Sequence, residues 1–377
     1  MRRGTYILNL LVPVFILLSI PSPRVHGQSA TIAVSQFITP DARSQGMGRA
    51  FTAIAEGPSA NWWNPGALGI SRSFYFSPWS AARLVPDLAD DVWMRTFGLT
   101  GHYRGIGLGA HVAYLSYGES PIVDGYGHAV GSFDSWEVVA LLGAGIDVIQ
   151  LMNPEQKNIR WGIGGNLKYF DLDLAPAGAG GVEGPATCST WDMDLGTLMV
   201  LRLPLDVGAD GNQSRSSAGT PPSFIGIRGG YMLKNVLDHT LKFPSEDMRY
   251  PLMRFDRLGL AFELGFMHMP PLGYLIRWNV LTLDWENVYF DGSYYNRAID
   301  YRGTELTILG IFTVRHGYID DKEGEVTDDT WGLGFGVDRS TEKFSRIGGR
   351  FDYASVPQAE GLDRVSHYTL SFWIGFQ

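Results

Sequence analysis

From residue 72 to the C-terminal end, apolar side chains recur at every second position in many short segments. Between 367 and 376 a large apolar residue alternates with a small or polar one, and 256–266 repeats this pattern with leucine and phenylalanine on one side. Such alternation indicates β-strands, because successive side chains of a strand point to opposite faces of the sheet. One face is apolar, and the other carries mostly glycine and charge. This part of the chain is therefore predicted to be all-β.

Fourteen segments show this alternation, and an even number of antiparallel strands is typical of single-chain bacterial membrane barrels. Many of them are long enough for a tilted crossing of a bilayer, which takes about 9–11 residues. A transmembrane barrel turns one face to lipid and the other to its lumen, so we interpret the glycine-rich face as the wall of a crowded lumen. The predicted strands are 72–79, 93–103, 105–117, 134–148, 159–172, 190–203, 223–235, 255–267, 273–289, 301–309, 311–319, 329–338, 344–355 and 366–376.

The lengths of the connections alternate, as they do in barrels with short turns at one end and long loops at the other. Short connections fall near 104, 149–158, 268–272, 310 and 339–343. The stretch 204–222 breaks the alternation, and it is either an insertion or a sign of a misplaced strand boundary. The long connections are 80–92, 118–133, 173–189, 236–254, 290–300, 320–328 and 356–365.

The first 27 residues have the pattern of a secretory signal peptide. Arg2 and Arg3 precede a largely apolar run from Tyr6 to Ile20, and Gly27 stands where a signal peptidase would cut. An uncleaved anchor is the alternative, although a transmembrane helix needs about 20 apolar residues. No later segment is long and apolar enough for such a helix. The exported chain is therefore either soluble or a barrel in the outer membrane, because a barrel needs no long apolar run.

Composition narrows the classes of partner. Charged residues make up 18% of the chain and aromatic residues 13%, which excludes a disordered chain. The net charge is −9, or −12 without the three arginines of the first 27 residues, so nucleic acid is not expected as a partner. The single cysteine, Cys188, excludes a disulfide framework and a cysteine-based metal site, and it is predicted to lie in an outer loop.

Residues 28–71 do not alternate, and we interpret them as a plug folded into the barrel. Met47, Phe51 and Ile54 have helical spacing, which predicts a short amphipathic helical turn. A block this rich in apolar residues is not expected to be a bare tail. The predicted organisation is a signal peptide at 1–27, an N-terminal hatch at 28–71 and a 14-stranded antiparallel transmembrane β-barrel at 72–377.

The stretch 41–68 resembles the N-terminal signature of the PorV/PorQ family, within the wider superfamily of FadL-type fatty-acid transporters. It matches at Gly46-Met47-Gly48, at Ala50-Phe51 and at Trp63-Asn64-Pro65, followed by Gly66-Ala67-Leu68 in place of the family's Ala-Gly-Leu. The resemblance implies a fourteen-stranded barrel closed by an N-terminal hatch, with Asn64 and Pro65 in the hatch inside the barrel. It also implies one of two activities. FadL-type members pass hydrophobic molecules, whereas PorV binds exported cargo at the translocon of type IX secretion.

Two sets of residues are candidate sites. An aromatic group at the junction of hatch and barrel (Trp62, Trp63, Phe74, Tyr75, Phe76 and Trp79) is either an interfacial belt or a pocket for a hydrophobic ligand, lined by Trp62, Trp63, Phe74 and Phe76. Charges on the inner face form either a network that holds strands and hatch together or a polar pathway. These charges are Glu137, Arg160, Lys168, Asp192, Asp194, Arg228, Arg257, Glu263, Arg315, Arg346, Arg350 and Asp352.

The remaining motifs point away from catalysis. No Gly-x-Ser-x-Gly turn and no His-Glu-x-x-His pair occurs, so we expect no enzyme and no cofactor. The acidic stretch 320–329 lacks the spacing of a calcium loop and is expected to be a solvated outer loop. The chain is expected to contact outer-membrane lipid. Its predicted function is transport of a hydrophobic small molecule, with a secretion module that binds translocon and cargo proteins as the alternative.

Overall fold

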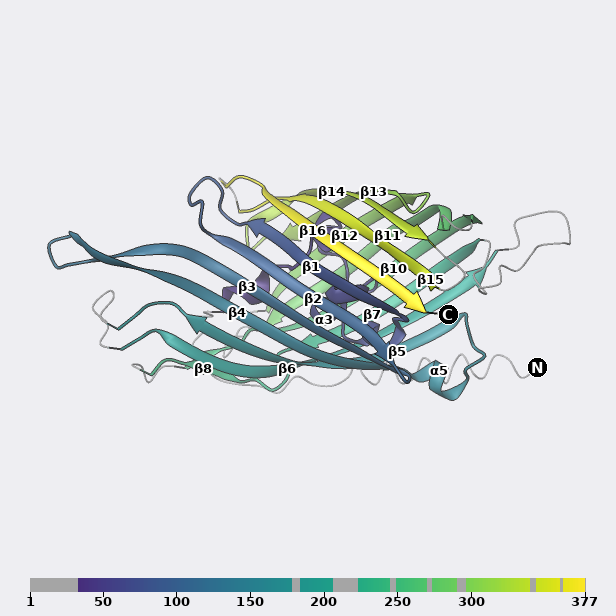
Figure 1. Ribbon diagram of the computed structural model, residues 1–377, viewed down its shortest axis with the longest axis horizontal. Coiled ribbons are helices and arrows are strands. Elements are labelled where there is room, and N and C mark those ends of the chain that lie inside the picture. Colours follow the sequence, from purple (N-terminus) through teal and green to yellow (C-terminus); the bar gives the residue numbers. More distant parts are fainter. Residues whose placement is uncertain are drawn as a thin grey trace, which may run out of the picture.

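The computed structural model describes residues 33–177, 184–205, 223–244, 249–269, 273–289, 296–339, 344–359 and 362–376. Within these ranges fourteen strands close into one antiparallel barrel, in which β1 pairs with both β2 and β16 (Figure 1). The strands are β1 (Ser73–Arg83), β2 (Trp93–Tyr103), β3 (Ile106–Val123), β4 (Ala129–Asp147), β5 (Ile159–Asp173), β6 (Thr187–Pro204), β7 (Phe224–Lys234), β10 (Arg254–Met269), β11 (Gly273–Tyr289), β12 (Asn296–Ile308), β13 (Phe312–Asp321), β14 (Val326–Arg339), β15 (Phe344–Val356) and β16 (Val365–Phe376).

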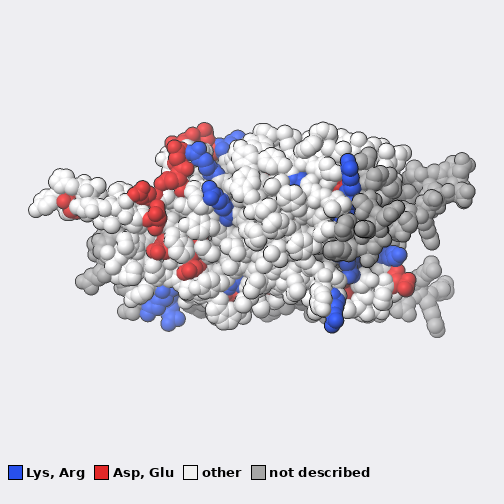
Figure 2. Space-filling model, in the orientation of Figure 1, with Lys and Arg blue, Asp and Glu red and all other residues white. Residues whose placement is uncertain are grey.

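The alternation along each strand separates an apolar outer face from an inner face of polar and small residues. On β16, Tyr368 and Phe372 are exposed on the outside, whereas His367 and Thr369 are buried on the inside. The face shown in Figure 2 is almost free of charge across the middle of the barrel, and lysine, arginine and acidic residues gather toward the two ends. An uncharged band across the outer face of a closed barrel is the surface that a lipid bilayer requires. None of the helices in the described part of the chain is long and apolar enough to cross a membrane.

The fourteen predicted strands are confirmed, but several extend further than predicted. The expected loop at 118–133 is mostly strand, because β3 runs to Val123 and β4 begins at Ala129, leaving a turn at 124–128. This hairpin projects beyond its neighbours at the end that carries the long connections, hereafter the loop end (Figure 1). Both of its faces are largely exposed there, so no alternation marks these residues as strand. The acidic stretch 320–329 is likewise a hairpin between β13 and β14.

The predicted strand boundaries on either side of 204–222 are correct. β6 and β7 are paired up to Pro204 and Phe224, so both predicted strands are in place. Residues 206–222 lie outside the described residues. Cys188 is not in a loop as predicted, because it lies near the start of β6, where its side chain is buried. The long connection between β7 and β10 contains a small hairpin of β8 (Thr240–Lys242) and β9 (Arg249–Pro251).

Residues 33–72, hereafter the plug, fold inside the barrel. They form η1 (Val34–Phe37), α2 (Ala42–Gly46), η2 (Gly57–Ser59), α3 (Ala60–Trp63) and α4 (Gly66–Ile70). Figure 1 shows this segment in purple, surrounded by strands. The predicted signal peptide at 1–27 lies outside the described residues.

The predicted helical turn through Met47, Phe51 and Ile54 is wrong. The helix α2 begins at the cap Asp41, whose carboxylate accepts the Ser44 N–H at 2.9 Å, and it ends at Gly46. Gly48 and Arg49 follow with φ of 61° and 64°, a left-handed conformation that stops a right-handed helix. The three apolar residues are still buried, because they belong to one hydrophobic cluster of plug and strand residues.

Glycines on the inner wall allow the plug backbone to lie directly against the strands. A β-carbon at Gly303 or Gly317 would collide with the backbone of Met47 or Gly48. On the other side of the barrel, Gly162 and Gly164 leave the same room for Pro65 and Gly66. We call these wall glycines, against which the plug backbone packs, the glycine seats. Close packing of the plug explains why the inner face of the strands is rich in glycine.

Candidate ligand sites in the lumen

Free space in the lumen lies on both sides of the plug. A cavity of about 570 Å³ lies toward the end with the short turns and the C-terminus, hereafter the turn-end cavity. A pocket of about 190 Å³ lies toward the loop end, hereafter the loop-end pocket. The packed plug residues between them include Phe51 and Trp63, whose rings lie 5.8 Å apart, and both are fully buried.

The loop-end pocket combines aromatic walls with cations. The Lys234 ammonium lies 4.9 Å from the ring centre of Trp62 and 6.0 Å from that of Phe255. The Arg257 guanidinium lies 4.5 Å from the ring of Trp63 and 4.9 Å from that of Tyr301. Cations on ring faces are stabilised by the ring quadrupoles and leave the ring edges to line an apolar space. The pocket therefore offers aromatic surface to the apolar body of a small molecule, beside charged side chains that can bind its polar atoms.

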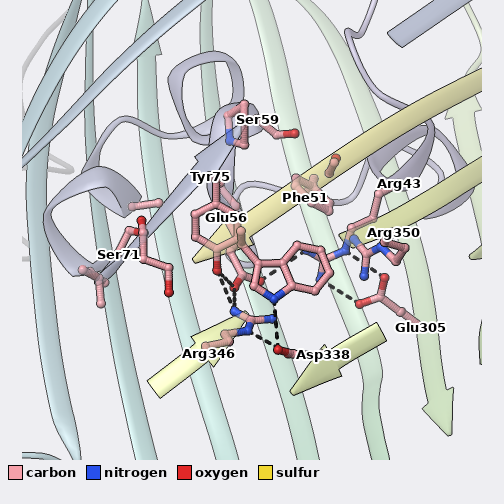
Figure 3. A pocket seen from close by; sticks show the side chains of 18 of the residues that line it. Arg43, Phe51, Glu56, Ser59, Ser71, Tyr75, Glu305, Asp338, Arg346 and Arg350 are labelled. Atoms are coloured by element: carbon pink, nitrogen blue, oxygen red, sulfur yellow. Dashed lines mark hydrogen bonds and ion pairs between the residues drawn. The ribbon is translucent and has the colours of Figure 1, made fainter. Parts of the chain in front are cut away.

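In the turn-end cavity, ion pairs join charged residues of the plug to charged residues of the barrel wall (Figure 3). Arg346 of β15 contacts Glu56 of the plug at 3.0 Å and Asp338 of β14 at 2.7 Å. The Tyr75 hydroxyl donates a hydrogen bond of 2.6 Å to the same Glu56 carboxylate. Burial by itself would raise the pKa of Glu56, but the positive charges of Arg346 and Arg43 hold this pKa well below its usual range. Glu56 is therefore ionised and ties the plug to the wall.

The predicted inner-face charges all point into the lumen, where most of them form ion pairs between neighbouring strands. Arg257 and Glu263, six residues apart on β10, pair with other strands as expected, because Arg257 contacts Glu286, and Glu263 contacts Arg228 and Arg277. The other pairs between strands are Arg160 with Asp147, Lys168 with Asp194 at 2.6 Å, and Arg315 with Glu305 at 2.6 Å and with Asp352 at 2.8 Å, while Arg350 pairs with Asp352 of its own strand at 2.8 Å.

Two predicted acidic residues bind backbone groups instead of cations. Glu137 accepts hydrogen bonds from the N–H groups of Val34 and Ser35 in the plug, at 3.2 and 2.9 Å. Asp192 accepts them from Leu237 and His239, at 3.0 and 3.1 Å, and so fixes the connection that follows β7. Both carboxylates are fully buried, and these N–H donors replace the water that they lose.

The hatch motif residues occupy buried positions against the wall. The Asn64 amide donates to the carbonyl groups of Thr52 at 3.1 Å and Thr197 at 2.9 Å, while its oxygen accepts the Gly66 N–H at 3.0 Å. Asn64 therefore joins two parts of the plug to β6. Pro65 lies against Gly164 and Gly196 of the wall, and Gly46 packs against Gly332.

The four aromatic residues predicted to form one ligand pocket do not come together. Trp62 and Trp63 are buried in the lumen, whereas Phe74 and Phe76 project from the outer face of β1. The register of β1 explains this separation, because Phe74 and Phe76 alternate with the inward-facing Tyr75. Of these four aromatic residues, Trp62 and Trp63 line the loop-end pocket, and Phe74 and Phe76 do not.

Several residues of the charge and hydrogen-bond network in the lumen were missed in the sequence. Glu286, Glu305, Arg277 and Asp338 lie on the inner faces of predicted strands, so continuing the alternation along each strand would have found them. Asp284 accepts hydrogen bonds from the N–H groups of Phe51 and Thr52, at 2.9 and 2.8 Å. Its position in the alternation along its strand also places it on the inner face. Arg43 and Glu56 carry no such signal, because they belong to the non-repetitive plug. Within the described ranges, no group of three potential metal ligands occurs.

Comparison with known proteins gives structural neighbours but no sequence family. No family model and no curated protein matches the chain. Solved structures that resemble it include the toluene transporter TbuX of Ralstonia pickettii (13% identity, 89% of this chain and 98% of that chain, TM-score 0.45) and a FadL homologue of Pseudomonas aeruginosa (10%, 90% and 99%, 0.43). The toluene transporter TodX of Pseudomonas putida is similar at 13% identity over 93% of this chain and 98% of that chain, with a TM-score of 0.40. Two of these neighbours are toluene transporters and the third is a FadL homologue, and none of the comparisons shows the PorV/PorQ family.

Proposed function

We propose that this protein is an outer-membrane barrel that binds a hydrophobic small molecule at its loop end and releases it sideways through the barrel wall. The uncharged band supports insertion in a bilayer, and an exported barrel belongs in the outer membrane. The plug supports a selective route, because its backbone is seated on wall glycines and its side chains are paired with wall charges. A wide water-filled channel does not fit such an interior.

The loop-end pocket supports the choice of ligand. Its aromatic walls suit an apolar body, and its size suits a small molecule and not a polypeptide. In a barrel of this kind the long loops face the outside and the short turns face the periplasm. The pocket is therefore on the side from which an external compound arrives.

The observation that carries the proposal is an interruption of the wall at Pro78, in the middle of β1. Between Phe76 and Trp79 the pairing with β16 shifts by one residue, and between Ser77 and Ser80 the pairing with β2 shifts as well. Proline cannot donate a ladder hydrogen bond, so a bulge forms and the wall is locally weakened on both sides. The turn-end cavity reaches this place, because Ser77 and Ser80 line it.

The route is tested by locking β1 to β16. Phe76 and Phe372 are cross-strand partners on the outer face, so Phe76→Cys with Phe372→Cys, in a Cys188→Ser background, places a disulfide beside the bulge. The matched control is Val314→Cys with Leu333→Cys, an outward pair between β13 and β14. Uptake of radiolabelled toluene and laurate is measured in cells that lack other such transporters, before and after oxidation.

We expect oxidation to reduce uptake by about tenfold for the β1–β16 pair, with recovery after reduction and no change for the control pair. Equal uptake with the bulge locked and unlocked would contradict the lateral route. The secretion-module alternative has no support among the comparisons, and no specific contact in the described part of the chain favours it, so it is not proposed.

A further inference from the structure

The turn-end cavity is rich in cations although the chain as a whole is acidic. The net charge of the full chain is −9. Among the described residues that line the cavity, ten are arginine or lysine and five are aspartate or glutamate. Excess charge of one sign in a recessed site attracts ligands of the opposite sign, because the surrounding wall screens it less than bulk water would.

The excess of positive charge is concentrated around Glu263, where a single carboxylate lies near three arginines. Glu263 contacts Arg277 at 2.6 Å and Arg228 at 3.0 Å, and Arg202 lies further away at 4.0 Å. Elsewhere in the cavity the charges are closer to balance, since Arg346 lies between Glu56 and Asp338, and Arg43 lies between Glu56 and Glu305.

Among these three arginines, Arg202 has a spare donor. Its buried Nε has no hydrogen-bond partner among the described residues, and 42% of its side chain is accessible. Its guanidinium lies 5.1 Å from the ring centre of Phe224, which holds it in place without using its N–H groups. A guanidinium with free N–H donors, held beside two further arginines, is a binding site for a carboxylate or phosphate group.

Aromatic rings stand next to these arginines. Tyr274 contacts Phe224 edge to face with ring centres 5.3 Å apart, and His268 contacts Tyr274 in the same way at 4.9 Å. All three rings line the cavity together with Arg202. Their faces and edges provide an apolar surface within reach of the anion donors.

From this arrangement we infer a second ligand site, formed by Arg202, Arg228 and Arg277 with Phe224, Tyr274 and His268. It binds an anionic group that is carried on an aromatic or apolar body. The aromatic rings contact the body, and Arg202 and Arg277 donate hydrogen bonds to the carboxylate or phosphate. The site lies below the plug, in the cavity that also reaches the bulge at Pro78, and it is separate from the loop-end pocket. Anion binding there rests on the arginines and the rings, so it does not require the wall to open between β1 and β16.

Calorimetric titration of the purified barrel in a non-ionic detergent tests this site. Benzoate is the probe, benzyl alcohol is the neutral molecule of similar size, and inorganic phosphate is the anion without an apolar body. The variants are Arg202→Gln, Arg202→Lys and the control Arg104→Gln, an exposed arginine in the β2–β3 turn at the same end of the barrel. The shift in gel mobility on boiling verifies that each variant is folded.

We expect benzoate to bind at least about tenfold more tightly than benzyl alcohol or phosphate. Arg202→Gln weakens benzoate by about tenfold, Arg202→Lys weakens it less because the charge remains, and Arg104→Gln leaves it unchanged. Equal affinities for benzoate and benzyl alcohol would overturn the anion site, and phosphate binding as tight as benzoate would overturn the role of the rings. A folded Arg202→Gln variant with unchanged benzoate affinity would also refute the proposal, whatever the result of the β1–β16 lock.

Discussion

The side-chain amide of Asn64 in the plug donates a hydrogen bond of 2.9 Å to the carbonyl of Thr197 in β6. The same amide group donates a hydrogen bond of 3.1 Å to the Thr52 carbonyl. One buried residue therefore joins two segments of the plug to each other and to the wall. Hydrogen bonds of this kind matter most when one partner is removed, because the remaining groups stay buried without a partner.

The first prediction follows from this pair. Asn64→Ala removes the side-chain donor to the carbonyls of Thr52 and Thr197, which destabilises the docked plug by roughly 1–3 kcal/mol. Amide hydrogen exchange of plug peptides should speed up, while exchange in the barrel strands is unchanged. The exposed Asn153→Ala, at the end of the helix α5 (Val148–Met152), serves as control. Unchanged protection of the plug in Asn64→Ala would show that this residue does not anchor it.

The second prediction concerns the glycine seats. Gly317→Ala places a methyl group against the backbone of Gly48, where no flexible side chain can move away. Overpacking of this kind costs about 1–3 kcal/mol or expels the segment that it meets. Limited proteolysis should then cleave within residues 41–68.

Gly229→Ala is the matched control for this test, because its new methyl group would meet only the Leu260 side chain, at an ordinary 3.6 Å. It should leave the plug protected. Cleavage in both variants, or in neither, would argue against glycine seats as the reason for the inner glycine face.

The third prediction is a pH dependence of plug docking through Glu56. Its pKa is depressed when the plug is docked, so the docked state gains stability above the ordinary carboxyl value of about 4.3 and loses it as the pH falls below that value. Plug protection should therefore be constant near neutral pH and decline in acid. Glu56→Gln should be less protected at pH 7 and should show a smaller decline. Identical pH profiles for the two proteins would assign the acid sensitivity to other groups.

The barrel could be predicted almost completely from the sequence, because the period of two is imposed by the contrast between lipid and lumen. The same physical cause explains the errors. The β3–β4 hairpin between Gly118 and Gly131 lies where that contrast ends, so its strands carry no alternation. The pairing of Arg257 with a residue of another strand was predictable, because Arg257 faces the lumen and lies too far along its own strand from Glu263 to pair with it.

The site was less predictable because it depends on how the plug folds. The helical turn predicted through Met47, Phe51 and Ile54 does not form, because α2 ends at Gly46 and the left-handed backbone at Gly48 outweighs the apolar spacing. Trp62 and Phe74 are close in sequence, but one faces the lumen and the other faces lipid. Partners such as Arg43 and Glu305, at 2.7 Å, are 262 residues apart, and only the closed barrel brings them together.

Native mass spectrometry of the barrel, extracted gently from its own membrane, tests the central claim most directly. Trp62→Leu removes a wall of the loop-end pocket, and Trp79→Leu, which changes an exposed tryptophan of β1, is the control. We predict a copurifying hydrophobic small molecule on the wild-type protein and on Trp79→Leu that is lost from Trp62→Leu. A stoichiometric protein partner without any bound small molecule would contradict the account and point to the outer loops as the functional surface.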